Sequence, residues 1–304
     1  MGTAPDIVIL GSLNMDFGLV VPDFPRPGET LLCDRIAVSP GGKGGNQAVA
    51  AARAGARVAF VGVVGDDANG SALIDFMRGE NIATDAIFRA DAPTGMAYVV
   101  VNGAGENTIV VAAGANQRVT SDHCTQAPSA PFYLAQLEVP VRTVEAFFAR
   151  GRAEGATCVL NAAPACADAH GLFDLCDIII VNESELESYA GYSLADAEAA
   201  IAAAMALLSR PGQSIIVTQG SRGILHVSSG GGRFSESHKV DVVDTTGAGD
   251  CFCGNLVARL AQGASQEQAI SRASAAAALS VSREGAAFGM PYGRDTDTFL
   301  SHAF

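Results

Sequence analysis

The fold of this chain is indicated most clearly by Val242-Val243-Asp244-Thr245-Thr246-Gly247-Ala248-Gly249-Asp250-Cys251-Phe252-Cys253-Gly254-Asn255. The pattern predicts the end of an apolar strand, a turn with two glycines, and a helix whose first turn carries Asp250. The N–H groups of Gly247, Ala248 and Gly249 have no partner within such a helix, so they favour a phosphate or a developing oxyanion. Asp250 beside them is a candidate base. A plain strand-to-helix turn with an N-capping Asp is the alternative that this stretch alone leaves open.

Another glycine-rich segment lies far earlier in the chain, Pro40-Gly41-Gly42-Lys43-Gly44-Gly45-Asn46-Gln47. It opens an alanine-rich run of helical pattern, which predicts a second helix start presented to a ligand. It is not a Walker A loop, because Ala37 and Gly44 stand where that motif needs Gly and Ser or Thr. Neither segment contains G-x-G-x-x-G, so a dinucleotide-binding site is not supported. The alternative is that the four glycines only let the helix pack closely, which leaves Lys43 and Asn46 unexplained.

Composition and charge narrow the class of protein. The 304 residues carry 19 Lys and Arg against 32 Asp and Glu, a net charge of −13, so we expect no nucleic-acid partner. No apolar run approaches the roughly 18 residues of a membrane span, and the first residues lack the pattern of a signal peptide. We therefore expect no membrane contact and a cytoplasmic location. Any phosphorylated ligand has to be held by local amides and a metal, because the overall field repels it.

Seven cysteines are scattered along the chain without a C-x-x-C pair, and the five histidines form no H-x-x-x-H. This distribution predicts reduced thiols and no zinc site. Cys251 and Cys253 follow the candidate base directly, so a redox role is conceivable. They fall early in an apolar helix, however, where small residues pack. We expect a structural role for both.

Apolar strands and helical patterns alternate along the chain. Residues 6–12 form a continuous apolar run, which is typical of a strand buried on both faces of a parallel sheet. Further strands are predicted over residues 58–64, 87–89, 132–137, 158–161, 178–181 and 214–218, with helices over 69–79, 141–154, 196–208, 250–261 and 266–281. A flexible tip is expected at 230–232, and the chain after residue 285 predicts no element. The fold class is therefore α/β, with a mostly parallel central sheet.

Four short segments do not fit this central sheet. They cover residues 17–21, 30–39, 94–102 and 107–113. Prolines at positions 22, 25 and 27 separate the first two, and a glycine-containing turn joins the last two as a hairpin. We expect these segments to form a separate four-stranded sheet.

Asn182 and Glu185 lie one turn apart at a helix start that follows the strand at 178–181. Amide and carboxylate oxygens in this arrangement suit a hydrated magnesium ion. An Asn cap with a Glu three residues later is equally a plain capping arrangement, and the sequence leaves both interpretations open.

With both glycine-rich segments placed, the chain resembles the ribokinase-like (PfkB-type) family of carbohydrate kinases over nearly its whole length. Shorter matches are Gly11-Ser12-x-Asn14-x-Asp16, Pro27-Gly28-Glu29-Thr30, Gly65-Asp66-Asp67, Gly114-Ala115-Asn116, Gln136-Leu137-Glu138, Asn182-Glu183-x-Glu185 and Thr218-x-Gly220-Ser221-Arg222-Gly223. The Gly-Gly-Lys-Gly-x-Asn form is more similar to the ribokinase branch than to fructokinases or nucleoside kinases. The resemblance implies a three-layer α/β/α core from residues 1–13, 40–92 and 114–304. It also implies a β lid from residues 14–39 and 93–113, which pairs two subunits into a homodimer.

The resemblance further implies ATP- and magnesium-dependent phosphorylation of the primary hydroxyl of a pentose, D-ribose by preference, to ribose 5-phosphate. Asp250 is then the base, and the amides of Gly247, Ala248 and Gly249 form the anion hole. The implied sugar-binding residues are Asn14, Asp16, Gly42, Lys43, Asn46, Glu138 and Asp250. The residues implied along the nucleotide are Asn182, Thr218, Gly220, Ser221 and Gly249, with Asn182 and Glu185 acting on magnesium. Alternatives are a kinase for another small sugar or a nucleoside, and a non-catalytic sugar-binding regulator.

Family members of this kind also bind a monovalent cation, usually potassium, beside the anion hole. The positions that match are Asp244, Thr246, Ser280, Arg283 and Gly285. Gly289 stands where relatives often place a Ser that helps to ligate the cation, so backbone carbonyls have to supply most of the ligands here. The alternative is an ordinary ion pair between Asp244 and Arg283.

Overall fold

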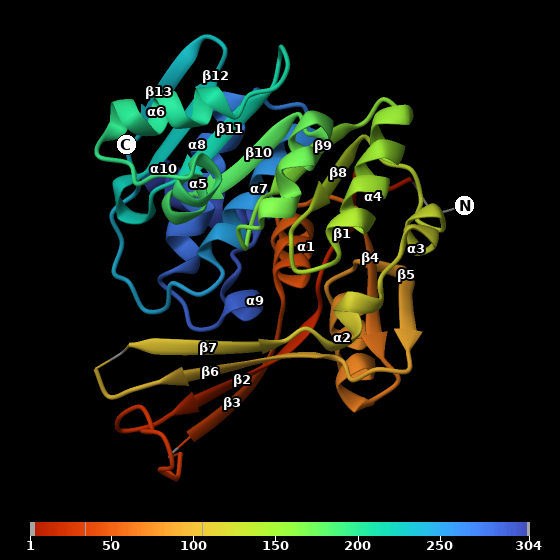
Figure 1. Ribbon diagram of the computed structural model, residues 1–304, viewed down its shortest axis with the longest axis vertical. Helices are drawn as coiled ribbons and strands as arrows, with labels where there is room; N and C mark the ends of the chain where they lie inside the picture. The colour runs from red at the N-terminus through yellow and green to blue at the C-terminus, as the bar shows by residue number, and fades with distance from the viewer. Residues whose placement is uncertain (1–3, 34, 105, 303–304) are drawn as a thin grey trace.

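A nine-stranded sheet forms the centre of the computed structural model, which describes residues 4–33, 35–104 and 106–302. The strand order is β13-β12-β11-β10-β9-β8-β1-β4-β5 (Figure 1). The strands are β1 (Ile7–Leu10), β4 (Val58–Gly65), β5 (Ala83–Ala90), β8 (Phe132–Ala135), β9 (Thr157–Asn161), β10 (Ile178–Asn182), β11 (Ser214–Thr218), β12 (Ile224–Ser228) and β13 (Gly231–Ser235). Neighbouring strands from β5 to β11 are parallel, whereas β12 and β13 pair antiparallel. The predicted α/β class is confirmed.

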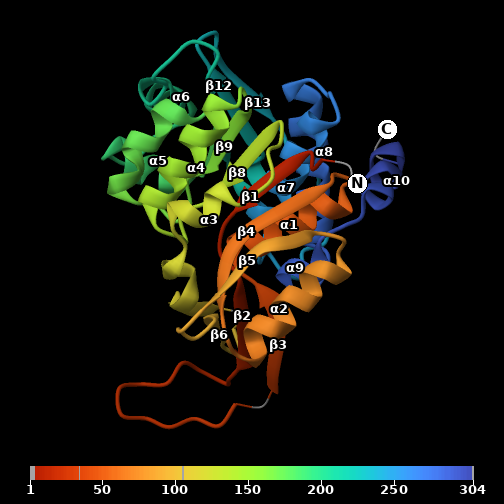
Figure 2. The same cartoon turned by 90° about the vertical axis from the view of Figure 1, so that its right-hand side faces the viewer.

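Helices cover both faces of this sheet (Figure 2). One face packs against α3 (Ser121–Thr125), α4 (Val141–Ala153), α5 (Glu183–Ala190) and α6 (Ala197–Ala206), and the other against α1 (Lys43–Arg53), α2 (Ala68–Gly79), α7 (Ala248–Ala261) and α8 (Gln266–Ser280). In β1, Val8 and Leu10 join the first layer, and Ile7 and Ile9 join the second. Successive side chains of a strand point to opposite faces of its sheet. Because helices cover both faces here, all four side chains are fully buried. The three-layer α/β/α core is confirmed.

A separate four-stranded sheet projects from one end of this core, at the bottom of Figure 1. It has the order β3-β2-β6-β7 and comprises β2 (Asn14–Val20), β3 (Arg35–Gly41), β6 (Gly95–Val101) and β7 (Asn107–Ala112). The small sheet predicted from the four short segments is confirmed. The strand expected over 30–39 begins only at Arg35, and the proline-rich stretch before it contains no strand among its described residues.

The expected strand at Val242 and Val243 is wrong. These residues belong to no strand, and their side chains are 63% and 58% exposed. The backbone N–H groups of Val243 and Asp244 both donate to Val281 O, which follows α8, at 2.7 and 3.1 Å. Two β-branched residues resemble a strand end locally, but the end of a helix occupies the place where a neighbouring strand would have to lie.

The sequence also missed elements at the edge of the sheet and near the C-terminus. The supposed tip at 230–232 leads into β13, which pairs with β12. After α8 come α9 (Ala286–Gly289) and α10 (Gly293–His302), and short 3₁₀ segments lie at Gly114–Arg118, Ala167–Leu175 and Gly220–Arg222. No helix in the described part of the chain is both long and apolar enough to cross a membrane.

The predicted polar residues gather because the parallel strands end at one edge of the sheet. β1 and β8 are neighbours, and the chain runs from β1 towards β4 and β5 but from β8 towards β9, β10 and β11. Such a reversal opens a crevice at the carboxyl ends of the strands, where α/β proteins bind ligands. Asn14 lies just past β1, Glu138 just past β8, and Asn182 ends β10.

Candidate active site

The glycines at the start of α1 allow two backbones to approach closely. Gly42 precedes the helix with a φ of 84°, which favours glycine. A Cβ on Gly44 would lie 2.6 Å from Ser12 N, and one on Gly45 would lie 2.9 Å from the side chain of Leu13. Close packing against the segment after β1 is therefore one reason for this glycine run.

The N–H groups at the start of α1 are already occupied by protein acceptors. Lys43 N donates to Glu138 Oε2 at 3.0 Å, Gly44 N to the Ser12 hydroxyl at 3.3 Å, and Gly45 N to Ser12 O at 2.9 Å. These three N–H groups are therefore satisfied within the protein, and what the start of α1 offers a ligand is the side chain of Lys43, which lines the cavity described below. Glu138, from beyond β8, caps the helix and also accepts the Ser12 hydroxyl.

The start of α7 is open. Gly247 is its N-cap with a φ of 77°, and a Cβ on Gly249 would meet no heavy atom within 4 Å. In the described ranges of the chain, neither Gly249 nor Asp250 donates its backbone N–H to an acceptor, and Ala248 N reaches only Thr245 O at 3.3 Å. These groups point the positive end of a helix dipole at any ligand that enters.

Asp250 lies in the first turn of α7 and is only 6% exposed. Two amides of α1 hold its carboxylate: Asn46 Nδ2 donates to Oδ2 at 3.0 Å, and Gln47 Nε2 donates to Oδ1 at 2.9 Å. Burial raises the pKa of Asp250, whereas Lys43 and these two hydrogen bonds oppose the rise. The arrangement joins the two glycine-rich helix starts through one buried carboxylate.

Lys43 is the cation among several carboxylates. Asp250 is the main cause of the raised pKa of Lys43, and Glu138 and Glu185 act in the same direction, while burial opposes them. Burial also raises the pKa of Glu185. Charged groups whose pKa values are shifted by burial and by one another are typical of functional sites.

Asp16 and Asn14 belong to β2, and Asp16 lies near the carboxyl groups of Glu138 and Asp250. Burial, together with the nearby charges of Glu138 and Asp250, raises the pKa of Asp16 to about 7, and its buried Oδ1 has no hydrogen-bond partner among the residues that the structure describes. Asn14 is 3% exposed, and its Oδ1 accepts from Asn116 Nδ2 at 2.7 Å. Within the described residues the Asn14 amino group has no hydrogen-bond acceptor.

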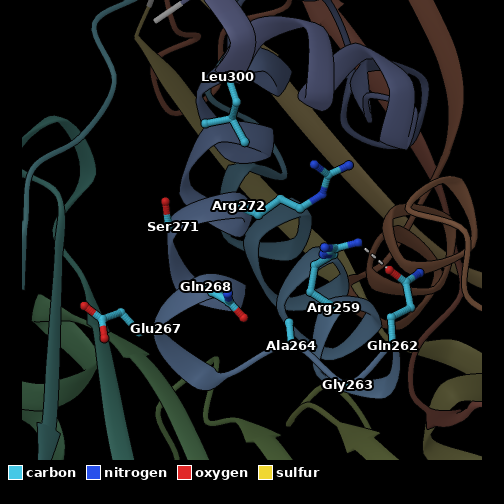
Figure 3. Close-up of a pocket in the computed structure, with 9 residues that line it drawn as sticks. All are labelled: Arg259, Gln262, Gly263, Ala264, Glu267, Gln268, Ser271, Arg272 and Leu300. Atoms are coloured by element: carbon cyan, nitrogen blue, oxygen red, sulfur yellow. Dashed lines mark hydrogen bonds between the residues drawn. The ribbon is translucent and has the colours of Figure 1, made fainter. Parts of the chain in front are cut away.

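A cavity of about 130 Å³ lies beside Asp250, between the starts of α1, α5 and α7, and its lining includes none of Asn14, Asp16, Asn46 and Glu138. Its lining comprises Lys43, Asn161, Ala163, Ile180, Asn182, Glu185, Thr218, Thr245, Gly247, Ala248, Gly249, Asp250 and Cys253. A wider hollow of about 700 Å³ lies between α7, α8 and α10 (Figure 3) and is lined by residues such as Arg259, Gln262, Glu267, Gln268, Arg272 and Leu300. That hollow contains no predicted site residue, so chemistry rather than volume identifies the smaller cavity as the candidate active site.

The two residues predicted to act on magnesium form a capping box at the start of α5. Glu185 N donates to Asn182 Oδ1, and Asn182 N donates to Glu185 Oε2, both at 2.8 Å. The plain capping interpretation is therefore confirmed, and both residues also line the cavity. Gly220 and Ser221 do not line it; they are exposed in the 3₁₀ turn after β11.

Asp244 connects the turn before α7 to the segment that precedes α9. Its Oδ1 accepts from Thr246 N at 2.9 Å and from the Thr246 hydroxyl at 2.6 Å, and its Oδ2 accepts from Gly285 N at 3.0 Å. Arg283 pairs with Asp295 at 3.1 Å. The alternative of an Asp244–Arg283 ion pair is therefore wrong.

Several residues of the site were not assigned a role from the sequence. Gln47 and Asn161 lie against Asp250 or its neighbours, and Asn116 orients Asn14. Ser12 and Asn161 are polar residues at the ends of buried strands, which is the one local signal that marks them. Cys251 and Cys253 are fully buried, and burial raises the pKa of both thiols, which agrees with the expected structural role.

Comparison with known proteins agrees with this chemistry. A family model described as pfkB family carbohydrate kinase matches residues 4–292. The chain belongs to the PfkB family. This PfkB kinase is 38% identical over 302 residues to the ribokinase of Haemophilus influenzae, covering 98% of this chain and 99% of that protein. It is 31% identical over 302 residues to the deoxyribokinase of Salmonella typhi, with 97% and 99% covered.

Solved structures extend the same likeness to the fold. The ribokinase of Arabidopsis thaliana, solved in complex with ribose and ATP, matches with a TM-score of 0.88 and 28% identity over 98% of this chain and 99% of that one. The ribokinase of Thermotoga maritima matches with a TM-score of 0.88 and 31% identity over the same shares. The ribokinase-like fold and the carbohydrate kinase class expected from the motifs are confirmed.

Proposed function

We propose that this PfkB kinase transfers the γ-phosphoryl group of ATP to the primary hydroxyl of D-ribose, giving ribose 5-phosphate and ADP. One observation carries the proposal: the buried Asp250 carboxylate lies in the same cavity as the N–H groups of Gly247, Ala248 and Gly249. Within the described residues only that of Ala248 has an acceptor, Thr245 O at 3.3 Å. Phosphoryl transfer needs alignment, donors for the transferring oxygens and a group that takes the hydroxyl proton. The start of α7 offers all three.

In the proposed reaction, Asp250 accepts the proton of the primary hydroxyl while the sugar oxygen forms its bond to the γ-phosphorus and ADP leaves. The amides at the start of α7 bind the equatorial oxygens, where negative charge develops. The raised pKa of Asp250 makes it a stronger base than an exposed Asp.

We assign sugar binding to the side of the site formed by the start of α1, β2 and the segment after β8, which we call the closed side. The residues are Asn14, Asp16, Gly42, Lys43, Asn46 and Glu138. Asp16 Oδ1 and Asn46 Oδ1 are buried acceptors without a partner, and buried polar atoms are normally satisfied. Sugar hydroxyls supply the missing donors, and the free amino group of Asn14 binds a hydroxyl oxygen.

We assign ATP to the other side of the site, beside the ends of β10 and β11 and the start of α7, which we call the open side. Asn182, Thr218 and Gly249 line the cavity, and Gly220 and Ser221 lie exposed in the 3₁₀ turn that follows β11. One carboxylate and one amide are too few ligands for the octahedral shell of Mg²⁺, so Asn182 and Glu185 act on the ion through water and the ATP phosphates supply direct ligands.

We also propose a potassium ion beside the anion hole. Asp244 ties Thr246 to Gly285, and the carbonyl oxygens of Ser280 and Glu284 both lie 3.5 Å from the place that a Cβ on Gly289 would occupy. Backbone carbonyls are suitable ligands for a large, weakly hydrated cation. The ion orders the turn before Asp250; Arg283 acts only indirectly, since its side chain pairs with Asp295.

The small sheet is the proposed lid and dimer interface, with residues 14–39 and 93–113 as its bounds. Strand register places Ile36, Val38, Tyr98 and Val110 on the same face, and each is between 38% and 65% exposed. A second copy of the sheet covers this apolar face. We further propose a cytoplasmic location, which the seven free cysteines support.

A coupled ADP-release assay on the purified protein tests the proposed reaction. The panel is D-ribose, 2-deoxy-D-ribose, D-fructose and adenosine, and we expect the highest kcat/KM for D-ribose. The likeness to a deoxyribokinase makes 2-deoxy-D-ribose the second candidate substrate. A higher kcat/KM for any other member of the panel contradicts the assignment to ribose, and binding of ribose without ADP release indicates a non-catalytic regulator.

A further inference from the structure

Gln47 lies near the start of α1, and Gln136 lies just past β8. Both side chains are fully buried. The Gln47 side chain makes three hydrogen bonds. Its Nε2 donates to Asp250 Oδ1 at 2.9 Å and to Asn161 Oδ1 at 3.0 Å, and its Oε1 accepts from Gln136 Nε2 at 2.6 Å. A chain of amides therefore runs from the central sheet to the proposed base.

The direction of this chain follows from the chemistry of its end. An ionised carboxylate only accepts hydrogen bonds, so Gln47 must turn its amino group toward Asp250. Its carbonyl oxygen then faces Gln136, which must donate in turn. The opposite orientation of Gln47 would place its carbonyl oxygen against two acceptors, Asp250 Oδ1 and Asn161 Oδ1.

Asn46 and Gln47 hold the two oxygens of Asp250 in different ways. Asn46 donates to Oδ2 and keeps its own Oδ1 unpartnered, whereas Gln47 donates to Oδ1 and accepts from Gln136. Asn46 can therefore bind both the base and the sugar. Gln47 is fully buried, and both its amino group and its carbonyl oxygen are hydrogen-bonded within the protein.

We propose that Gln47, held in place by Gln136, is a positioning residue that sets the orientation and the proton affinity of Asp250. The proposal rests on the proposed function, in which Asp250 is the base. A matched donor on each carboxylate oxygen holds its plane, so the remaining lone pairs face the cavity in which the hydroxyl has to bind.

Other groups around Asp250 set the background for its titration. They are the ammonium of Lys43, the carboxyl groups of Asp16, Glu138 and Glu185, and the thiols of Cys251 and Cys253. None of them is changed by a substitution of Gln47. Burial raises the pKa of Asp250 and the Gln47 bond opposes the rise, so loss of this bond raises the pKa further.

Gln47→Met keeps the length of the side chain and removes the donor. We expect kcat to fall about tenfold or more, the acid limb of the kcat–pH profile at saturating ribose and ATP to move up by about one pH unit, and the KM values for ribose and ATP to stay within about threefold. Gln47→Glu places a second acceptor beside Asp250 and is expected to move the limb further. Gln136→Met acts through Gln47 and is expected to move it less.

Gln213→Met is the matched control. Gln213 is 1% exposed and its amide also makes several hydrogen bonds, to Phe173 O at 2.6 Å, to Cys176 O at 3.0 Å and from Ser209 N at 2.8 Å. It precedes β11, at the end of the sheet away from the cavity. We expect a lower Tm with the parent pH profile, whereas a Gln47 variant changes the profile as well.

The outcomes separate the inference from the proposed function. If Asp250→Asn is inactive while every folded variant of Gln47 and Gln136 keeps the parent acid limb and kcat, the positioning role is wrong and Asp250 remains the base. If Asp250→Asn retains activity, the proposed function fails first. If a Gln47 variant does not fold, as judged by circular dichroism, Gln136→Met decides the question. A shift of its acid limb supports the positioning role, and an unchanged limb contradicts it.

Discussion

The starts of α1 and α7 look alike in sequence and differ in the structure. Each carries a run of glycines before an apolar helix, and each helix start lies at the same site. At α1, Ser12 and Glu138 accept the first N–H groups, and a Cβ on Gly44 would meet backbone at 2.6 Å. At α7, a Cβ on Gly249 would meet nothing within 4 Å.

This difference shows that glycine serves two purposes in one active site. The glycines of α1 let a helix pack against the segment after β1, which builds the closed, sugar-binding side of the proposed site. At α7, Gly249 leaves the space in which the proposed reaction places a phosphate. Asp250 joins the two sides, because it starts on α7 and is held by the Asn46 and Gln47 amides of α1.

Asp250→Asn tests the group that joins the two helix starts, and it should have the largest effect. The amide cannot take the hydroxyl proton, so we expect kcat to fall by about 10²–10⁴ while the affinities for ribose and ATP change little. Steady-state kinetics and calorimetry on the purified variant measure both. Turnover of ribose within threefold of the parent rate contradicts the assignment of Asp250.

Gly249→Ala and Gly44→Ala separate the two purposes of glycine. Gly249→Ala adds a methyl group at the open helix start, so we expect kcat/KM to fall at least tenfold with an unchanged or slightly raised Tm, since Ala favours helix over Gly by about 0.5–1 kcal/mol. Activity close to that of the parent would show that the open start does not bind phosphate.

Gly44→Ala adds the same methyl group at the closed start. Overpacking against backbone costs about 1–3 kcal/mol, so we expect a lower Tm by thermal melting. An unchanged Tm here, with an unchanged Tm for Gly249→Ala, removes the distinction between the two starts.

Asp16 tests the closed side through sugar affinity and pH. The Asp16 carboxylate accepts hydrogen bonds from sugar hydroxyls, each worth roughly 1.5–3 kcal/mol, so Asp16→Ala should weaken ribose binding at least tenfold. Since the pKa of Asp16 is raised to about 7, ribose affinity of the parent should rise with pH up to about 7 and then level off. Titration calorimetry over about 1.5 pH units to each side of that pKa measures the pH dependence of ribose affinity.

The same raised pKa has a consequence for stability. Folded Asp16 binds a proton more tightly than unfolded Asp16, so this residue destabilises the folded chain increasingly as the pH rises from the unfolded pKa near 3.8 to about 7. Asp16→Asn should therefore raise Tm relative to the parent at alkaline pH and leave it unchanged at pH near or below the unfolded pKa. Equal Tm differences at both pH values contradict the raised pKa.

The dependence of activity on potassium tests the turn before α7, and we expect it to be the smallest of these effects. If a cation orders the turn from Asp244 to Asp250, activity in potassium should exceed that in sodium or a bulky organic cation severalfold at matched ionic strength, with saturating magnesium and ATP. Asp244→Ala should lower the difference. Equal rates in all three salts would leave Asp244 with only the structural role of joining Thr246 to Gly285.

Much of the site was predictable because short motifs carry its chemistry. Asp250 and the glycines before it lie within one turn of a helix, so their relation follows from local geometry. The partners of Asp250 were less accessible: Asn46 and Gln47 lie 204 and 203 residues away in sequence. Asn46 was assigned through the family motif, whereas Gln47, in the same motif, received no role, since nothing local places its amide on the second carboxylate oxygen.

Local pattern was sufficient to establish the α/β alternation, the separate small sheet and the two glycine-rich helix starts. These follow from hydrophobic period and from the backbone properties of Gly and Pro, which each residue carries wherever it lies. Long-range packing alone established that Val242 and Val243 form no strand, that Glu138 caps α1, and that the start of α7 stays open. Whether a strand pairs, or a helix N–H finds an acceptor, depends on what a distant part of the chain brings beside it, and only the tertiary structure contains that information.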